Sequence, residues 1–216
     1  MRNERYSPLM FVTPESPLPD LLLLIKAFLE GGGRWVQLRI KNSVQSDWVY
    51  AATQACALCH GFGATFIVND NPYVALASGA DGLHLGKYDM TVADARKIVG
   101  NEMIIGGTAN TLDDMLALAN VEVDYIGLGP FRFTSTKKNL SPIIGIEGYS
   151  HIMKAFRSRG SKIPVTAIGG ILPEDVPDIV ATGVDGVAVS GCLGTIFMAE
   201  ENTARLFSLL SEVAVK

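Results

Sequence analysis

The chain alternates short, strongly apolar runs with longer segments in which apolar and polar residues are mixed. Each apolar run is rich in Val, Ile and Leu and is bounded by Gly or Asp, which is typical of buried strands in a parallel sheet. The segments between them are long enough for helices, so the pattern predicts repeated βα units. The eight predicted strands are Leu9–Thr13, Arg34–Arg39, Thr65–Asn69, Gly82–Leu85, Met103–Gly107, Tyr125–Gly129, Ile163–Ile168 and Gly186–Ser190.

Helix-start chemistry supports the positions of the predicted helices. Thr91 with Asp94, and Thr111 with Asp114, are each spaced for a capping box in which Asp replaces the usual Glu. Pro173 suits the first position of a helix. The predicted helices span residues 19–31, 46–61, 72–78, 91–99, 112–119, 145–159, 173–181 and 199–213.

Eight alternating units within 216 residues predict an α/β fold, a single (β/α)₈ TIM barrel that forms one domain over residues 1–216. A doubly wound open sheet with six or fewer strands is the alternative. Asp81, Asp124 and Asp185 precede predicted strands in similar turns, and we interpret them as scaffold residues that order those turns. In barrels of this kind function collects at the C-terminal ends of the strands, so we expect the chemistry there.

Composition narrows the class of protein. Hydrophobic residues make up 48% of the chain and charged residues 19%, as in a protein with a large core. The 18 Lys and Arg against 22 Asp and Glu give a net charge of −4, which argues against nucleic-acid binding. The apolar run Leu21–Ile25 is broken by Lys26, so neither a signal peptide nor a membrane span is predicted. We expect a cytoplasmic protein whose partners are small molecules, with no nucleic acid and no membrane. A homodimer stays an open alternative to a monomer.

Three cysteines, Cys56, Cys59 and Cys192, are an odd number without the spacing of a disulfide framework, and fit free thiols in a reducing compartment. Residues 56–60 also match the C-x-x-C-H signature of haem attachment. The surrounding segment is Ala-rich and lacks Pro, so we interpret it as a helix that packs Cys56 and Cys59 as small hydrophobic residues. Haem attachment is the alternative.

Polar residues gather where the predicted strands end. Gln37, Arg39 and Lys41 alternate with apolar neighbours, which would direct three polar side chains to one face. A forked guanidinium beside an ammonium suits a phosphate or diphosphate. The alternative is that Arg39 pairs with a barrel carboxylate such as Asp70.

Two carboxylates follow neighbouring strands. Asp70 comes directly after the third predicted strand, and Asp89 lies in the loop after the fourth. Such charges repel unless something positive lies between them, and oxygen ligands next to phosphate-binding cations suit Mg²⁺. The alternative is that each Asp caps the following helix.

Later strand ends add further candidates. Residues 129–138 form a long loop with three hydroxyls and two lysines, which would fold over the mouth as an anion-binding lid or remain a solvated loop. Gly169-Gly170 and Ser190-Gly191 follow the last two strands, where many barrels bind a phosphate through backbone N–H groups. His84 lies within an apolar strand, and we interpret it as a hydrogen-bonded core residue rather than a ligand.

These motifs together resemble one family. The segments are Val36–Lys41, Ile67–Asp70, Asp81–Gly86 with Asp89, Gly127–Pro130, Thr134–Lys138, Ala167–Ile171 and Gly186–Ser190. In this order they resemble the thiamine-phosphate synthases, over nearly the whole chain. The resemblance implies a transferase that joins an aminomethylpyrimidine diphosphate to a thiazole phosphate or its carboxylated form. It further implies release of pyrophosphate by a dissociative mechanism assisted by Mg²⁺.

The resemblance also implies roles for individual residues. Asp70 and Asp89 would be the Mg²⁺ ligands. Arg39, Lys137 and Thr108 would be catalytic, with Thr108 where the family usually has Ser. The implied substrate-binding residues are Gln37, Leu38, Arg39, Ile40, Lys41, Asn69, Thr108 and Lys137 toward the pyrimidine diphosphate, and Thr134, Ser135, Thr136, Gly170, Ser190 and Gly191 toward the thiazole phosphate.

The sequence departs from the family pattern in three places. Ile40 replaces a Glu, residues 106–110 differ from the usual run around the Ser, and Arg132-Phe133 replaces an apolar-Pro pair. Two other activities remain open: a thiazole tautomerase on the same barrel, and a non-catalytic barrel that binds a thiamine precursor. Asn69, Asp70, Asp89 and Lys137 argue against the tautomerase, which we expect to lack the diphosphate and metal residues.

Overall fold

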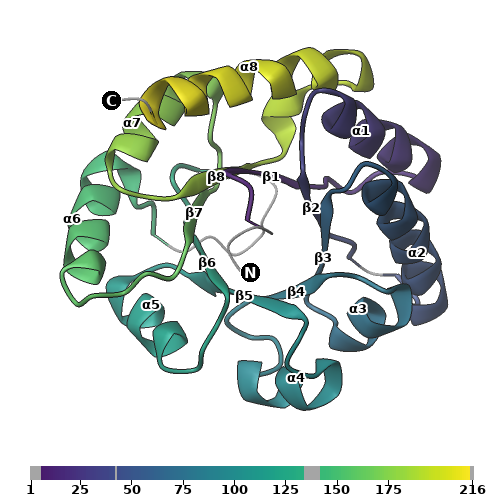
Figure 1. The fold of residues 1–216 in the computed structure, drawn as a ribbon, viewed down its shortest axis with the longest axis horizontal. Coiled ribbons are helices and arrows are strands. Elements are labelled where there is room, and N and C mark those ends of the chain that lie inside the picture. Colours follow the sequence, from purple (N-terminus) through teal and green to yellow (C-terminus); the bar gives the residue numbers. More distant parts are fainter. Residues whose placement is uncertain (1–5, 42, 134–141, 215–216) are drawn as a thin grey trace.

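The computed structural model describes residues 6–41, 43–133 and 142–214. Eight parallel strands pair in chain order and close into a barrel, because β8 pairs with β1 (Figure 1). The predicted barrel is confirmed, and the open sheet is wrong. The strands are β1 (Leu9–Val12), β2 (Trp35–Leu38), β3 (Thr65–Asn69), β4 (Gly82–Leu85), β5 (Ile104–Ala109), β6 (Tyr125–Leu128), β7 (Val165–Ile168) and β8 (Gly186–Val189).

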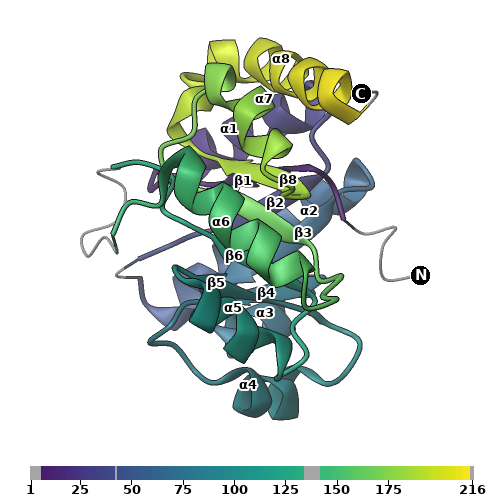
Figure 2. The ribbon, with the colours of Figure 1, turned by 90° about the vertical axis from the view of Figure 1, so that its left-hand side faces the viewer.

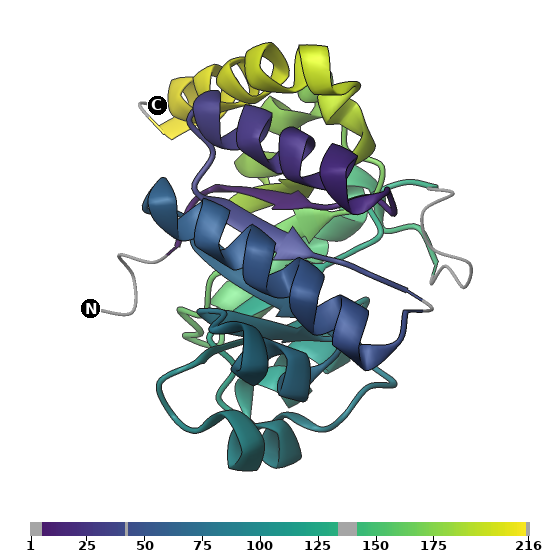
Figure 3. The ribbon, with the colours of Figure 1, turned by 90° about the vertical axis from the view of Figure 1, so that its right-hand side faces the viewer.

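The helices form a ring outside the barrel (Figure 1), and in the side view of Figure 2 they lie above, in front of and below the strands. In Figure 3 the arrowheads of the purple β1 and blue β2 point to the same end of the molecule, which is the mouth of the barrel. The helical elements are α1 (Leu18–Glu30), α2 (Gln45–Gly61), α3 (Pro72–Ser78), α4 (Val92–Val99), α5 (Leu112–Ala119), α6 (Gly145–Arg157), η2 (Pro173–Asp175), α7 (Val176–Ala181), η3 (Gly191–Leu193) and α8 (Ile196–Ala214).

Strand alternation divides the core into two layers. One set of side chains packs between the sheet and the helices, among them Phe11 and Leu38. The other set fills the barrel, where Trp35, Ile67 and Tyr125 pack together. Polar residues such as Gln37 also point into the barrel. Apolar side chains therefore fill the barrel at the end opposite the mouth, and polar side chains line it toward the mouth.

The three turn aspartates, Asp81, Asp124 and Asp185, connect strands and helices at the end of the barrel opposite the mouth. Each accepts a hydrogen bond of 2.7 to 2.8 Å from a backbone N–H at the start of an odd-numbered strand, and each contacts a basic side chain in the last turn of an even-numbered helix. The sets are Asp81 with Phe66 and His60, Asp124 with Ile105 and Arg96, and Asp185 with Val165 and Arg157. The scaffold interpretation is therefore confirmed.

Helix starts agree with the sequence at Thr111, which forms a reciprocal capping box with Asp114. At Thr91 the hydroxyl accepts from the backbone N–H of Asp94 but donates to its carboxylate, so only half of the box forms. The helix predicted over residues 173–181 is split into η2 and α7. Pro177 explains the division, because it has no N–H to donate and suits only the first turn of a helix.

The cysteine segment is a packed helix face. Cys56 and Cys59 lie on α2, both are buried, and all three cysteines are free thiols. Burial raises the pKa of the Cys56 thiol to about 11. Because Cys59 is fully enclosed, haem cannot be attached there in the folded protein. Among the helices that the structure describes, none is both long and apolar enough to cross a membrane.

Candidate active site

A cavity of about 810 Å³ opens at the C-terminal ends of the strands. Its floor consists of inward-facing barrel residues, and its rim is formed by the loops that follow the strands. Among the described residues that the sequence predicted for the site, ten line this cavity. They are Gln37, Arg39, Lys41, Asn69, Asp70, Asp89, Thr108, Gly170, Ser190 and Gly191.

Two predicted contacts do not reach the cavity. Leu38 is fully buried between the sheet and the helices, and Ile40 packs against the same outer core. Strand alternation explains this, because both residues lie on the face opposite Gln37 and Arg39. Their side chains therefore face away from the cavity, and the assignment of Leu38 and Ile40 as substrate-binding residues stays a prediction. The predicted Thr134, Ser135, Thr136 and Lys137, with Lys138 at the end of the proposed lid, lie outside the described residues.

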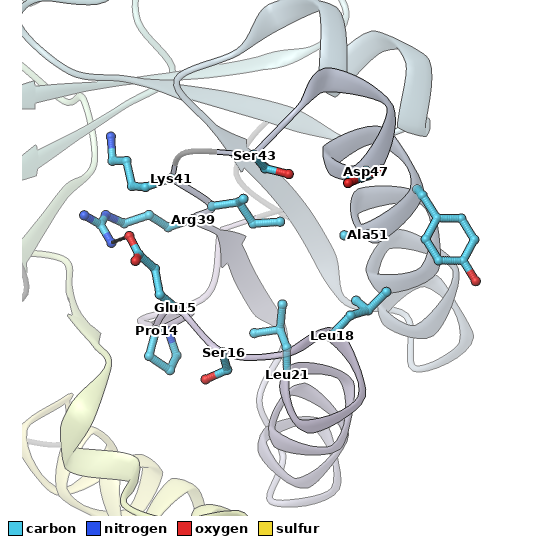
Figure 4. A pocket seen from close by; sticks show the side chains of 12 residues that line it. Pro14, Glu15, Ser16, Leu18, Leu21, Arg39, Lys41, Ser43, Asp47 and Ala51 are labelled. Atoms are coloured by element: carbon cyan, nitrogen blue, oxygen red, sulfur yellow. Dashed lines mark ion pairs between the residues drawn. The ribbon is translucent and has the colours of Figure 1, made fainter.

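The two rim cations of β2 have acidic neighbours. The Arg39 guanidinium lies 3.6 Å from the Glu15 carboxylate, which comes from the β1–α1 loop, and Figure 4 shows this pair. Lys41, rather than Arg39, pairs with Asp70, at 2.7 Å. Both cations also border a smaller hollow of about 340 Å³ between α1 and α2. This hollow is lined mainly by α1, α2 and their preceding loops, so we place the candidate site in the larger cavity.

Asp70 and Asp89 do not cap helices. Asn71 caps α3 and Thr91 caps α4, so the capping alternative is wrong. Asp70 has a φ of 68°, in the left-handed region that Asp tolerates better than most side chains, and its N–H donates to the His84 carbonyl at 2.8 Å. The backbone thus turns sharply to direct this carboxylate at the rim.

The two carboxyl groups are neighbours. Partial burial, together with the hydrogen bond and the charge of Asp70, raises the pKa of Asp89 above its usual range. The backbone N–H of Gly86 donates to Asp89 at 2.7 Å and opposes this shift. Two acids that disfavour each other's ionisation form a site that favours a proton or a cation between them.

The described ranges hold no group of three or more His, Cys, Asp or Glu side chains that would by itself bind a metal ion. Asp70 and Asp89 therefore offer a cation only part of its oxygen shell. This donor set suits Mg²⁺, which commonly takes one or two carboxylates and completes its shell with water and substrate phosphates. The residues present fit a cation that arrives with a phosphorylated substrate.

A buried polar cluster forms the floor of the cavity. Gln37 Nε2 lies 3.3 Å from Tyr125 Oη, which lies 2.9 Å from His84 Nδ1. His84 Nε2 lies 2.9 Å from the Thr108 hydroxyl. The hydrogen-bonded interpretation of His84 is confirmed, and His84 also lines the cavity. Burial raises the pKa of Tyr125, so its hydroxyl keeps its proton.

Sequence reasoning missed Tyr125 as a site residue. It begins β6, at the strand end where scaffold residues were expected, but its long side chain crosses the barrel toward β2 and β4. The available signal was its parity with Gly127, since both point inward.

The far rim is built from the β7 and β8 loops. Gly169 and Gly170 both have positive φ, and a Cβ at Gly170 would lie 2.5 Å from Cγ of Arg132. Arg132 donates to Asp175 at 2.6 Å and lies over the Phe131 ring. The unusual Arg132 therefore ties the β6–α6 loop to the segment that follows β7.

Comparisons with known proteins agree with this geometry. The family described as thiamine monophosphate synthase matches residues 9–193. A thiamine-phosphate synthase of Flavobacterium psychrophilum is 43% identical over 208 residues, covering 96% of this chain and 98% of that protein. One of Phocaeicola vulgatus is 48% identical over 176 residues, covering 82% and 83%. The solved thiamine phosphate pyrophosphorylase of Pyrococcus furiosus superimposes with a TM-score of 0.85 at 31% identity, covering 98% of both chains. The chain therefore belongs to the thiamine monophosphate synthase family.

Proposed function

We propose that the barrel mouth joins a pyrimidinylmethyl diphosphate to a thiazole phosphate, forming thiamine phosphate and releasing pyrophosphate. The C–O bond to the diphosphate breaks first, and the leaving group takes the electron pair. The thiazole nitrogen then donates its lone pair to the pyrimidinylmethyl cation and forms the new C–N bond. The observation that carries the proposal is the convergence of Arg39, Lys41, Asp70 and Asp89 on one rim of one cavity.

In this proposal the chain's cationic side chains stabilise the departing diphosphate. Negative charge grows on the diphosphate as it leaves, and fixed positive groups stabilise that charge more than they stabilise the bound substrate. Arg39 offers a forked donor and Lys41 a compact one, and we assign the same role to Lys137 from the family resemblance. A general base is not needed, because the attacking thiazole nitrogen carries a lone pair.

We assign Asp70 and Asp89 as the residues that would hold Mg²⁺. When bound, the metal would neutralise charge on the diphosphate oxygens. Burial raises the pKa of Asp89 most, and the neighbouring Asp70 raises it further; this second part supports the assignment, because a cation between the two carboxylates relieves their repulsion. Lys41 partly relieves the same repulsion through its ion pair with Asp70.

The remaining residues divide between the two substrates. Gln37, Asn69 and Thr108 line the floor, and we assign them to the pyrimidine side. Gly170, Ser190 and Gly191 lie together on the opposite rim, which suits the thiazole phosphate, and the family resemblance adds Thr134, Ser135 and Thr136. The positive φ of Gly170 supports a close approach of backbone to ligand.

We expect the enzyme to work in the cytoplasm, because its three cysteines are free thiols of the kind that a reducing compartment preserves. A homodimer is the assembly we would look for by measuring mass in solution.

Pyrophosphate release by the purified protein tests the proposed function. We expect release only when both substrates and Mg²⁺ are present, with thiamine phosphate formed in equal amount. Binding of both substrates without pyrophosphate would support a precursor-binding barrel instead. Isomerisation of a thiazole substrate without pyrophosphate would support the tautomerase.

A further inference from the structure

Four polar side chains form a continuous line of hydrogen bonds across the barrel floor. They come from four different strands: Gln37 from β2, Tyr125 from β6, His84 from β4 and Thr108 from β5. The three links measure 3.3, 2.9 and 2.9 Å. Gln37, Tyr125 and His84 are buried, while Thr108 is half-buried at the edge of the cavity.

The direction of the line is fixed at Gln37. Its amide nitrogen lies 3.3 Å from Tyr125 Oη and also 3.8 Å from the sulfur of Met10. A thioether sulfur can accept a hydrogen bond but has no proton to donate, so it favours the NH₂ side of the amide over the carbonyl side. The side-chain carbonyl oxygen of Gln37, Oε1, accepts no hydrogen bond from the described residues, yet it is not one of their fully buried side-chain atoms that lack a partner, and Gln37 lines the cavity. It therefore opens on the cavity.

The Gln37 orientation then determines which atom donates in each of the other two hydrogen bonds. Tyr125 Oη accepts from Gln37, and its own proton needs an acceptor because the ring is almost fully buried. His84 Nδ1, at 2.9 Å, is that acceptor. A neutral imidazole that accepts at Nδ1 carries its proton on Nε2, which then donates to Thr108 Oγ1. The Thr108 hydroxyl keeps its own proton for a group in the cavity.

The strands leave room for this line at two glycines. A Cβ at Gly106 would lie 2.2 Å from the Tyr125 ring and 2.7 Å from His84 Nδ1. A Cβ at Gly127 would lie 3.1 Å from His84. Any side chain at Gly106 would displace both rings. The hydrogen-bonded arrangement therefore requires that β5 and β6 carry no side chain at these two positions.

We propose that Tyr125 and His84 are positioning residues that form a one-directional relay, Gln37 to Tyr125 to His84 to Thr108. The relay presents the Gln37 carbonyl as an acceptor and the Thr108 hydroxyl as a donor to the cavity. It selects a ligand that offers an N–H group on the β2 side and an acceptor on the β5 side. The identification of that ligand as the aminopyrimidine diphosphate rests on the proposed function.

The His84 tautomer tests the relay directly, without turnover. Long-range ¹H–¹⁵N correlation of ¹⁵N-labelled, substrate-free protein resolves the ring nitrogens of its three histidines, and His84→Gln identifies the His84 signals. We expect one tautomer, with the proton on Nε2. A proton on Nδ1, or an even mixture of tautomers, would overturn the relay even if the enzyme is active. Absence of synthase activity with the Nε2 tautomer would instead count against the proposed function alone.

Variants test whether the relay positions the binding groups. Tyr125→Phe removes the donor to His84, so we expect a mixed tautomer and a KM for the pyrimidine diphosphate raised about tenfold, with a smaller change in kcat. Tyr149→Phe is the matched control, because this buried hydroxyl donates to the Leu128 carbonyl outside the cavity. An equal rise in KM in both variants would contradict the proposal.

A double variant separates positioning from general destabilisation. Thr108→Val removes the last hydroxyl of the relay, so Tyr125→Phe should cost less in KM in the Thr108→Val background than alone. Strictly additive effects would overturn the relay. If Tyr125→Phe does not fold, the wild-type tautomer still decides the question.

Discussion

The Lys41 ammonium lies 2.7 Å from Oδ2 of Asp70 at the mouth of the barrel. Asp70 also neighbours Asp89, so one cation is set against two carboxylates. Partial burial, followed by the hydrogen bond and charge of Asp70, raises the pKa of Asp89, and the charge of Lys41 opposes that rise without cancelling it. This arrangement therefore favours a further cation at the rim. Without that cation, the repulsion between the two carboxylates destabilises the folded protein.

Asp89→Asn should separate function from stability. The amide removes a charge but keeps an acceptor for the N–H of Gly86. We expect pyrophosphate release to fall about 100-fold or more, by analogy with the loss of a charge-stabilising group, while thermal unfolding in EDTA shifts slightly upward. Asp113→Asn, an exposed acid on α5, is the control and should change neither. A lower melting temperature for Asp89→Asn would show that the carboxylate is structural.

Arg39→Lys tests whether the forked guanidinium matters beyond its charge. Lysine cannot bind a diphosphate through two parallel N–H groups, so the KM for the pyrimidine diphosphate should rise about tenfold. Arg159→Lys, on the surface beyond α6, serves as the control. Steady-state kinetics with the thiazole phosphate saturating gives the answer, and wild-type values for Arg39→Lys would assign Arg39 a structural role.

Gly170→Ala should damage both backbone and rim. Gly170 has a φ of 69°, and the new Cβ would press on Arg132. Gly183→Ala provides a matched control, because Gly183 also has a positive φ, of 93°, but nothing lies within 4 Å of its added Cβ. Both variants should lose about 1–2 kcal/mol of stability from backbone strain. Only Gly170→Ala should raise the KM for the thiazole phosphate, and an equal KM in both would remove Gly170 from that site.

Asp124→Ala should destabilise the barrel without touching catalysis. It leaves the Ile105 N–H and the Arg96 guanidinium without this carboxylate. We expect a loss of about 1–3 kcal/mol, or roughly 2–4 °C in melting temperature per kcal/mol for a chain of this size. The exposed Asp178 on α7 offers a control substitution to Ala, worth a few tenths of a kcal/mol. A changed kcat/KM in Asp124→Ala would mean that the turn aspartates also affect the structure of the mouth.

Asp114 predicts a pH dependence of stability. Burial alone would raise the pKa of Asp114, but Lys87, the N–H of Asn110 and Thr111 hold it below its usual value of 3.8. The folded state thus binds this proton less readily than the unfolded state, so the stabilisation is present above pH 3.8 and is lost as the pH falls through the lower folded value. Asp114→Asn should therefore be less stable than wild type at pH 7, and the gap between their urea midpoints should close in acid. A gap that stays constant with pH would contradict this.

Much of the barrel was predictable because strand ends carry local signals. Asp marks the turns before β4, β6 and β8, joined by Gly before β4 and β8, and strand parity places Gln37 inward and Leu38 outward. The split of the helix predicted over 173–181 followed from Pro177, whose missing N–H is itself visible in the sequence.

The pairings inside the site were not predictable. Spacing indicated that Arg39, Lys41 and Asp70 would meet, but not that Lys41 would take Asp70 while Arg39 takes Glu15. Those choices depend on the path of the loops after β1 and β2. Tyr125 was missed for a related reason, since the reach of a long side chain across the barrel depends on barrel diameter rather than on local sequence.

The central claim is that Asp70 and Asp89 bind a divalent cation together with the diphosphate. The most direct measurement is the dissociation constant of pyrophosphate, with and without Mg²⁺, for the wild type and for Asp70→Asn and Asp89→Asn. Mg²⁺ should tighten pyrophosphate binding to the wild type at least about tenfold, a coupling of about 1.4 kcal/mol, and should have little effect on either variant. Equal tightening in all three proteins would contradict the account.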